Sequence, residues 1–502
     1  MSDAFISRQL IPERAAPVRT TGLVGFIRSR LLNSPGNILL TIASILLLWF
    51  TIVPSVKFLL VDAVWQGKDR NACLVENVGR TVGACWPFVQ AKFSQFIYGF
   101  YPQPERWRVN LTFLLAVALL LPLLVPRLPA KGLNSGLFFI AFPIVAFFLL
   151  YGGGIKGFGI AWSEAALSAL ANGLVDGGRR LAEATTLPLL SGILNGLGTL
   201  VGLIGYALAI VLWPLTFLRT YLQTAGQPVW GDVAATALIV SVLLFVLNGG
   251  FRTGWHALIL SLTTFAGIGM VIAILRLDRG GLPIVDTRLW GGMLVTLVVS
   301  VTGIVASMPV GIALALGRRS TIPLIRVFSV AFIEFWRGVP LITVLFFATY
   351  MLPLFLPGNF TVDSLTRVLI GIALFAGAYN AEVIRGGLAA IPRGQAEAAK
   401  ALGLSSWKTT GLIVMPQALR HVIPGLVNSF IALLKDTSLV SIVALFDLLG
   451  QLRASFADPT WSTPTTLFTG FAFAGMIYFV LCFGISRYSL FVEHRLNAHR
   501  RS

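Results

Sequence analysis

Uncharged apolar runs long enough to cross a lipid bilayer recur along this 502-residue chain. A helix needs about 20 apolar residues to span about 30 Å of hydrocarbon. The runs are rich in Leu, Ile, Val and Phe, and they lack the alternation that builds a membrane barrel. The sequence therefore predicts an all-α integral membrane protein. The longest runs are Leu31–Val56, Val109–Pro126, Gly132–Ile155, Ala184–Leu218, Val233–Phe251, Thr253–Leu275, Leu289–Gly317, Gly338–Val362 and Pro459–Ser486.

The scarcity of charge supports this assignment. Asp, Glu, Lys and Arg make up 12% of the chain, whereas 56% of the residues are hydrophobic. A soluble domain carries about 25% charged residues, so too few charges remain to cover a soluble surface of this size. The composition excludes a disordered chain, a soluble enzyme and a disulfide-built secreted domain. The net charge of +18 is typical of basic loops beside anionic lipid, and we expect no nucleic-acid partner.

Positive charge also predicts orientation. The N-terminal tail carries Arg8, Arg14, Arg19, Arg28 and Arg30, and the C-terminal tail carries Arg487, Arg495, Arg500 and Arg501. Because Lys and Arg concentrate on the cytoplasmic side, we expect both termini in the cytoplasm and the polar segment Asp62–Arg108 outside.

The chain divides into three zones. Residues 1–155 hold the N-terminal tail, three spans and the outer segment; 156–285 form a membrane zone rich in Gly, Ala and Leu; and 286–502 form the core. The middle zone needs an even number of crossings but shows three apolar runs. Either one run is re-entrant or the weaker segment Ile160–Val175 also crosses, so we expect 10 or 12 spans.

Two of the three cysteines, Cys73 and Cys85, lie in the segment expected outside. There they could form a disulfide, and two unpaired thiols are the equally open alternative. Cys482 lies in an apolar run, where we expect an inert core thiol. The cysteines and the scattered histidines predict no metal site.

Motifs for covalent chemistry are absent. The chain contains no G-x-x-x-x-G-K-[ST] phosphate loop, no H-E-x-x-H and no G-x-S-x-G. Gly152–Gly157 formally fits G-x-G-x-x-G, but it follows a membrane run rather than a strand, and we interpret it as a flexible loop. We therefore expect no enzyme active site and no cofactor bound by this chain.

One amphipathic segment between apolar runs carries the strongest signal. It reads Arg393-Gly-Gln-Ala-Glu-Ala-Ala-Lys-Ala-Leu-Gly403, with Pro392 suited to a helix start and the final glycine to a left-handed helix end. This segment and the residues after it resemble the E-A-A loop of ABC importer permeases. The resemblance implies a coupling helix that docks into a groove of the ATPase. The residues concerned are Glu397, Ala398, Ala399 and Gly403.

Flanking motifs sharpen the resemblance. Those that match the polar amino-acid permeases of the histidine, glutamate and glutamine type are Glu334-Phe-Trp-Arg-Gly-Val-Pro340, Tyr379-Asn-Ala-Glu-Val-Ile-Arg-Gly-Gly387 and Leu434-Lys-Asp-Thr-Ser-Leu439. The match covers Leu289–Arg487. Leu282–Trp290, together with the early spans, resembles the subgroup that imports general L-amino acids. The long middle zone departs from that subgroup and leaves topology and partner contacts open there.

This resemblance implies a fold and a set of partners. The fold is the transmembrane domain of a type I ABC importer, a five-helix core with additional N-terminal transmembrane helices. The function is a permease subunit that moves L-amino acids, such as glutamate, glutamine, aspartate or asparagine, across the bacterial inner membrane. The partners are a second, related permease, a dimer of ATP-binding subunits that holds ATP and Mg, a periplasmic amino-acid-binding protein and membrane lipid. An ion-coupled secondary amino-acid transporter is the alternative.

Charged and polar side chains inside the core suggest a path for a zwitterion. Two pairs are three residues apart and would share a helix face, whereas Lys435 and Asp436 are adjacent and diverge. Charges at membrane depth are costly and usually line pathways, and the alternative is ion pairing that fixes helix positions. The candidate pathway residues are Glu334, Arg337, Glu382, Arg385, Lys435, Asp436, Thr437 and Ser438.

Overall fold

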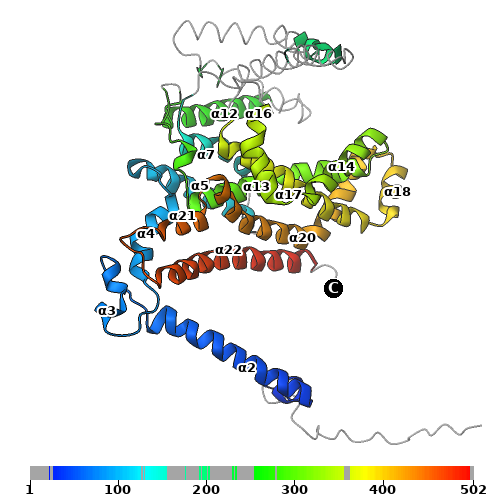
Figure 1. Cartoon of the computed structure of the whole chain (residues 1–502). Coiled ribbons are helices and arrows are strands. Elements are labelled where there is room, and N and C mark those ends of the chain that lie inside the picture. Colours follow the sequence, from blue (N-terminus) through cyan, green and yellow to red (C-terminus); the bar gives the residue numbers. More distant parts are fainter. Residues whose placement is uncertain are drawn as a thin grey trace, which may run out of the picture. The chain divides into compact units, whose positions relative to one another are not determined.

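The computed structural model describes residues 26–125, 131–154, 254–277, 280–355 and 362–497, together with isolated positions elsewhere (Figure 1). These residues are helical, and their only β-type pairing is in isolated bridges. Among them, seven helices are long and apolar enough to cross a membrane, or eight if one bent pair is a single span. The expected crossings at Ile160–Val175, Ala184–Leu218 and Val233–Phe251 lie outside the described residues, apart from isolated positions.

The described chain falls into two compact units. The first comprises residues 1–97 and 447–502, and the second comprises residues 98–446. These units differ from the three zones that the sequence predicts, because the first unit joins the two ends of the chain. The division at residues 155 and 285 stays a prediction.

The first unit contains two long membrane helices, α2 (Pro35–Val56) and α22 (Thr466–Asn497). Helix α2 begins where the Ser34 hydroxyl accepts a hydrogen bond from the backbone N–H of Asn37, with Pro35 in the first turn. It buries no residue in the protein. An apolar helix without a protein-covered face is suited to lipid.

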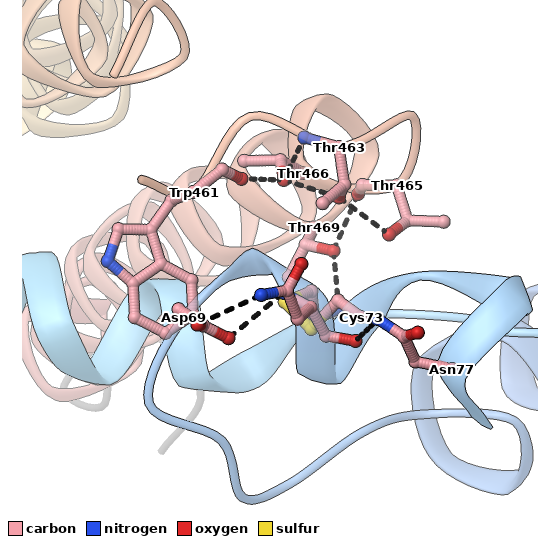
Figure 2. The surroundings of a disulfide bond; sticks show 10 residues. Asp69, Cys73, Asn77, Trp461, Thr463, Thr465, Thr466 and Thr469 are labelled. Atoms are coloured by element: carbon pink, nitrogen blue, oxygen red, sulfur yellow. Dashed lines mark hydrogen bonds between the residues drawn. A yellow bond between two sulfur atoms is a disulfide. The ribbon is translucent and has the colours of Figure 1, made fainter. Parts of the chain in front are cut away.

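A small polar layer in the first unit joins the segment after α2 to the segment before α22. It includes η3 (Arg70–Cys73), α3 (Val75–Val78) and α4 (Trp86–Tyr98) from the first, and α21 (Leu448–Ser455) from the second. The structure joins Cys73 and Cys85 in a disulfide, both sulfurs being buried. Next to it, the backbone N–H of Cys85 donates to the Thr469 hydroxyl at 2.9 Å (Figure 2). An ion pair between Lys92 of α4 and Asp458, which follows α21, also joins the two segments of this layer.

The second unit is built around two packed helices, α13 (Met293–Arg318) and α17 (Ser364–Ala389). They approach closely at glycines: a Cβ added at Gly377 would lie 2.6 Å from Val310 Cγ1, and one added at Gly311 would lie 2.9 Å from Asn380 Cβ. Close backbone approach of this kind drives helix association in lipid. Helices α14 (Pro323–Gly338) and α20 (Met415–Asp436) pack against this pair.

The apolar run Gly338–Val362 begins at a sharp bend in the chain. Helix α14 ends at Gly338, and Val339 and Pro340 are extended before α15 (Leu341–Phe346) begins. The continuation η8 (Phe347–Met351) and α16 (Leu352–Phe355) follows, and the two halves meet at an angle of 103°. Proline breaks the helix here because it disfavours helical conformation in the residue before it.

The N-terminal spans of the second unit, α5 (Arg106–Leu124) and α7 (Phe142–Tyr151), meet the start of the core at a backbone junction. Gly153 pairs with Leu282 through a backbone hydrogen bond of 2.7 Å. A Cβ at Gly281 would lie 1.9 Å from the Gly153 carbonyl oxygen, so only glycine fits. The run that we interpret as a flexible loop is therefore packed at Gly152–Gly154.

A buried ion pair lies beside this junction. The Arg108 guanidinium is inaccessible to solvent, contacts the Glu105 carboxylate at 2.5 Å and donates to the Pro283 carbonyl at 2.8 Å. Nearby, the Tyr101 hydroxyl donates to the Leu150 carbonyl at 2.8 Å, and burial raises the pKa of Tyr101 to about 12. These contacts tie the N-terminal spans to the core.

Candidate functional site

The segment that resembles a coupling loop forms the short helix α18 (Arg393–Ala401). Pro392 precedes it, and the chain leaves it through Gly403, whose φ is +78°. The N–H groups of Gly403 and Leu404 bond back to the Lys400 and Ala399 carbonyls at 2.9 and 3.1 Å. Glycine is required at this position because the left-handed conformation strains a residue with a Cβ.

The surface of this segment is open. Glu397, Ala398 and Gly403 are exposed, whereas Ala399 is buried against the protein. Two large apolar side chains beside the helix, Leu402 and Trp407, are each 83% exposed. Both side chains therefore lack cover by the described part of this chain and can contact a partner.

The segment is held in place from behind. The short helix α19 (Ser406–Lys408) begins where the Ser405 hydroxyl accepts from the Lys408 N–H at 3.4 Å. It continues through η9 (Thr409–Val414) into α20. The Gln417 amide of α20 donates to the Gln395 side chain at 3.4 Å. Helix α18 is therefore joined to the membrane helix α20 both through the chain and by a side-chain hydrogen bond.

The charged residues of the core form one network rather than two separate pairs. Glu382 pairs with Arg385 at 2.5 Å, as its helical spacing predicts, and also lies 3.3 Å from Arg318 and 4.0 Å from Arg337. Glu334 pairs with Arg318 at 3.2 Å, and within the described residues no ion pair joins Glu334 to Arg337. The network links α13, α14 and α17.

Arg318 is the member that sequence reasoning missed. It is the last residue of α13, and its guanidinium bridges Glu334 and Glu382. Its sequence signal is only a charge at the end of an apolar run. Its partners lie on other helices, and a helix-face spacing rule such as i, i+3 reaches only along one helix.

A second group of side chains lines a cavity of about 270 Å³ between α17 and α20. Asp436 lies in its wall with the polar side chains of Tyr379, Asn380 and Ser429, and the remaining wall is mainly apolar. The Asn380 amide donates to the Ser307 hydroxyl of α13 at 3.0 Å. The cavity can therefore offer a carboxylate, hydroxyls and aromatic rings to a small polar molecule.

The other residues predicted for the path lie elsewhere. Lys435 is exposed and is not part of the cavity wall. Thr437 is buried, and its hydroxyl donates to the Leu434 carbonyl at 2.8 Å, which stabilises the turn into η10 (Thr437–Val443). Ser438 is half-buried in the same turn. Of this cluster, only Asp436 meets the cavity. In the described part of the chain, no group of His, Cys, Asp or Glu side chains is placed to hold a metal ion.

The described chain thus combines membrane-length helices, an exposed short helix α18 and a polar cavity between core helices. Comparison with known proteins gives the class of protein. Residues 307–498 match the family described as the binding-protein-dependent transport system inner membrane component.

Two relatives match along their whole length. The inner membrane amino-acid ABC transporter permease protein YhdY of Escherichia coli K12 is 34% identical, with 97% of each chain covered. The Glutamate/glutamine/aspartate/asparagine transport system permease protein BztC of Rhodobacter capsulatus is 36% identical, with 100% of each chain covered. A crystal structure of an amino acid ABC transporter with histidines is 28% identical, covering 41% of this chain and 92% of that chain, with a TM-score of 0.36.

The chain belongs to the family of permease subunits of amino-acid ABC transporters. It is an all-α, multi-pass protein of the inner membrane with the importer core and additional N-terminal helices. Such a subunit performs transport, and ATP is hydrolysed by a separate subunit. A substrate-binding protein completes the system. Family membership also decides against the ion-coupled alternative.

Proposed function

We propose that this chain forms half of the path by which an ATP-driven importer moves polar and acidic L-amino acids, namely glutamate, glutamine, aspartate and asparagine. The observation that supports this most is the cavity between α17 and α20, with Asp436 in its wall. The substrate names come from the Rhodobacter capsulatus relative, whose printed name lists these four.

The cavity suits an amino acid chemically. The Asp436 carboxylate would accept the cargo ammonium group, and Asn380, Tyr379 and Ser429 provide polar atoms for the rest of the cargo. A bound cation also relieves the cost of a carboxylate in a poorly solvated place. In this scheme Glu334, Arg337, Glu382 and Arg385 brace the helices, and Thr437 and Ser438 shape the turn after the cavity.

Coupling to ATP is proposed to occur at α18. Glu397 and Ala398 would enter a groove of the ATPase with Leu402 and Trp407 beside them, and all four side chains are exposed. ATP and Mg would be bound by the partner dimer. A second, related permease chain would supply the other half of the path.

This assembly fixes an orientation. The coupling segment and both termini face the cytoplasm, and the polar layer with the Cys73–Cys85 disulfide faces the periplasm. The disulfide supports this arrangement, since disulfides persist in oxidising compartments. The periplasmic amino-acid-binding protein would deliver cargo to that face.

Uptake by the reconstituted complex tests the proposal. We expect accumulation of labelled glutamate only with ATP enclosed on the α18 side, whether or not an ion gradient is imposed. Asp436→Asn should reduce uptake about tenfold or more, because its interaction with the cargo is lost, while assembly and basal ATP hydrolysis remain. Lys435→Met, next in sequence but outside the cavity wall, is the matched control. Uptake driven by a gradient without ATP would refute the function, and normal uptake by Asp436→Asn would refute the site.

A further inference from the structure

Five arginines surround a second cavity of the second unit, with a volume of about 460 Å³. We call it the arginine pocket; its members are Arg318, Arg319, Arg326, Arg385 and Arg393. They come from the end of α13, the start of α14, the end of α17 and the first residue of α18. The rest of the wall is aliphatic, as at Val330 and Leu388, and it contains no carboxylate.

Two of the five arginines have carboxylate partners outside the pocket wall. Glu382 pairs with Arg385 and Arg318, and Glu334 also pairs with Arg318. Arg319 donates to the backbone carbonyl of Leu388 at 3.2 Å. This acceptor is neutral, so it does not neutralise the charge of Arg319. Within the described residues, no carboxylate forms an ion pair with Arg319, Arg326 or Arg393. Like charges around one cavity repel each other, and an anion in the cavity would relieve that repulsion.

We propose that the arginine pocket binds a phosphate-bearing anion, with the chemistry shared by a phospholipid headgroup and free phosphate, and that the bound anion positions α18 for coupling. The placement at the cytoplasmic surface rests on the orientation in the proposed function. The inner leaflet is rich in anionic phospholipid, and basic pockets between membrane helices bind such headgroups.

The pocket's chemistry favours phosphate over a simple halide or a lone carboxylate. Guanidinium groups present planar pairs of N–H donors that match the oxygens of phosphate. Several such groups around one cavity suit a group with three or more acceptor oxygens. The aliphatic wall at Val330 and Leu388 also suits the glycerol and acyl start of a lipid.

An occupied pocket would act on coupling through two of its members. Arg393 opens α18, the coupling helix, and Arg385 belongs to the network that braces α13, α14 and α17. An anion held jointly by Arg393 and the helix ends would reduce the freedom of α18 relative to those helices. Transport per ATP hydrolysed would therefore rise when the pocket is filled.

Binding to the intact complex is the first test. The change is Arg319→Gln with Arg326→Gln, which removes two pocket charges and leaves α18 and the Glu382 network untouched. The control is Arg420→Gln with Arg487→Gln, which removes two exposed charges outside the pocket. The thermal midpoint of delipidated complex is followed as dispersed phosphatidylglycerol, phosphatidylcholine or inorganic phosphate is added.

We expect phosphatidylglycerol or inorganic phosphate to stabilise the wild type and the control equally. The pocket variant should need at least about tenfold more of either, since it lacks the charge-assisted hydrogen bonds of two arginines. Response to the lipid alone identifies a headgroup, and response to phosphate alone identifies a soluble anion. Equal responses of pocket variant and control overturn the proposal. Loss of the ATPase subunits from the pocket variant, with unchanged lipid binding, overturns it as well and assigns the pocket to a protein contact.

Transport is the second test. Glutamate uptake per ATP hydrolysed is compared in vesicles of phosphatidylcholine alone and with added phosphatidylglycerol, or with enclosed phosphate. The wild type should gain severalfold from the effective anion, and the pocket variant should gain little. If no vesicle supports ATP-driven uptake, the proposed function fails; if uptake is normal but insensitive to the anion, only the pocket proposal fails. Should the double variant not assemble, Arg326→Lys keeps the charge, loses the paired donors and should bind with intermediate strength.

Discussion

At the scale of single residues, the Glu382 carboxylate forms ion pairs with three arginines. Arg385 binds it at 2.5 Å, Arg318 at 3.3 Å and Arg337 at 4.0 Å, and three quarters of its side chain is covered. Removing the Glu382 carboxylate takes the counter-charge from Arg385 and Arg337 and leaves Arg318 with Glu334 alone, which costs more than the loss of an exposed pair. Glu334 contacts only Arg318 among the described cations and is 56% exposed, so it is the natural comparison.

Glu382→Gln should therefore lower the thermal midpoint of the purified complex clearly more than Glu334→Gln does. We expect a loss of about 1–3 kcal/mol for the first and less than about 1 kcal/mol for the second. Equal effects would show that Glu382 is not the centre of the network.

Asp458 makes the stability of the folded protein depend on pH. The Lys92 ammonium and the Thr460 hydrogen bonds lower the pKa of Asp458 from 3.8 to about 2. Because the folded pKa lies below the unfolded value, the ion pair stabilises the protein above about pH 4, and this contribution disappears as the pH falls towards 2. The difference in thermal midpoint between wild type and Asp458→Asn should thus be constant near neutrality and shrink below pH 4. A difference that grows on acidification would contradict the assignment.

At the scale of elements, the coupling helix depends on its last turn. Gly403 has φ +78° and no neighbouring atom within 4 Å of an added Cβ, and Gly394 at the other end also has free space but lies within the helix. An alanine would meet no steric clash at either position, and only the alanine at position 403 would adopt a strained backbone conformation.

Gly403→Ala should cost about 1 kcal/mol of local strain, loosen the end of α18 and lower ATP-coupled uptake while the complex still assembles. Gly394→Ala, which is free of both strain and crowding, should leave coupling intact. Uptake per ATP hydrolysed is the readout. Equal coupling in both variants would mean that the turn does not set the docking geometry.

The disulfide is an element-scale feature as well, since it closes the loop between η3 and α4. Replacing Cys73 and Cys85 by serine should lower stability by about 2–4 kcal/mol and make the polar layer more sensitive to protease added from the outside. Cys482→Ser, which breaks no disulfide, is the control. Non-reducing mass spectrometry of protein from native membranes should show the intact bond; free thiols in that protein would remove this prediction.

Some of these elements could be predicted from the sequence alone, and others could not. The long apolar runs predict most membrane helices of the described chain, because a bilayer demands length and uniform apolarity. The bend at Gly338–Pro340 was not predicted, because the uncharged run starts at Gly338, directly after Arg337, and charge alone does not show how that run meets the helix before it. The coupling motif predicted α18 because its signals are local. Arg318 and the Asp436 cavity could not be predicted, because they arise where helices far apart in sequence meet.

At the scale of the whole molecule, the segments on either side of residues 154–281 meet at one backbone junction. Gly153 and Leu282, both in the second unit, are hydrogen-bonded to each other. In the same unit, Ile272 and Leu275, at the end of α12 (Gly254–Ile274) and just after it, lie in one cluster with Phe148 and Leu149.

Deleting residues 156–253 while keeping α12 should leave the ATPase bound, because α18 and its supports lie outside the deletion. Deleting 156–279 should also retain the ATPase but lower the thermal midpoint further, since it uncovers Phe148 and Leu149. Co-purification of the ATPase and the thermal midpoint are the measurements. Loss of the ATPase from both inserted, stable variants would show that the middle zone takes part in docking.

The glycine junction has a further consequence, which concerns time. Gly153 meets its partner only after the chain has grown to Leu282. At 5–20 residues per second, translation of the intervening stretch takes on the order of ten seconds. During that interval Arg108 lacks its hydrogen bond to the Pro283 carbonyl. The interface between the early spans and the core is therefore incomplete. A newborn copy thus has an incomplete junction for a period fixed by the length of the intervening stretch, and shortening that stretch would shorten the period.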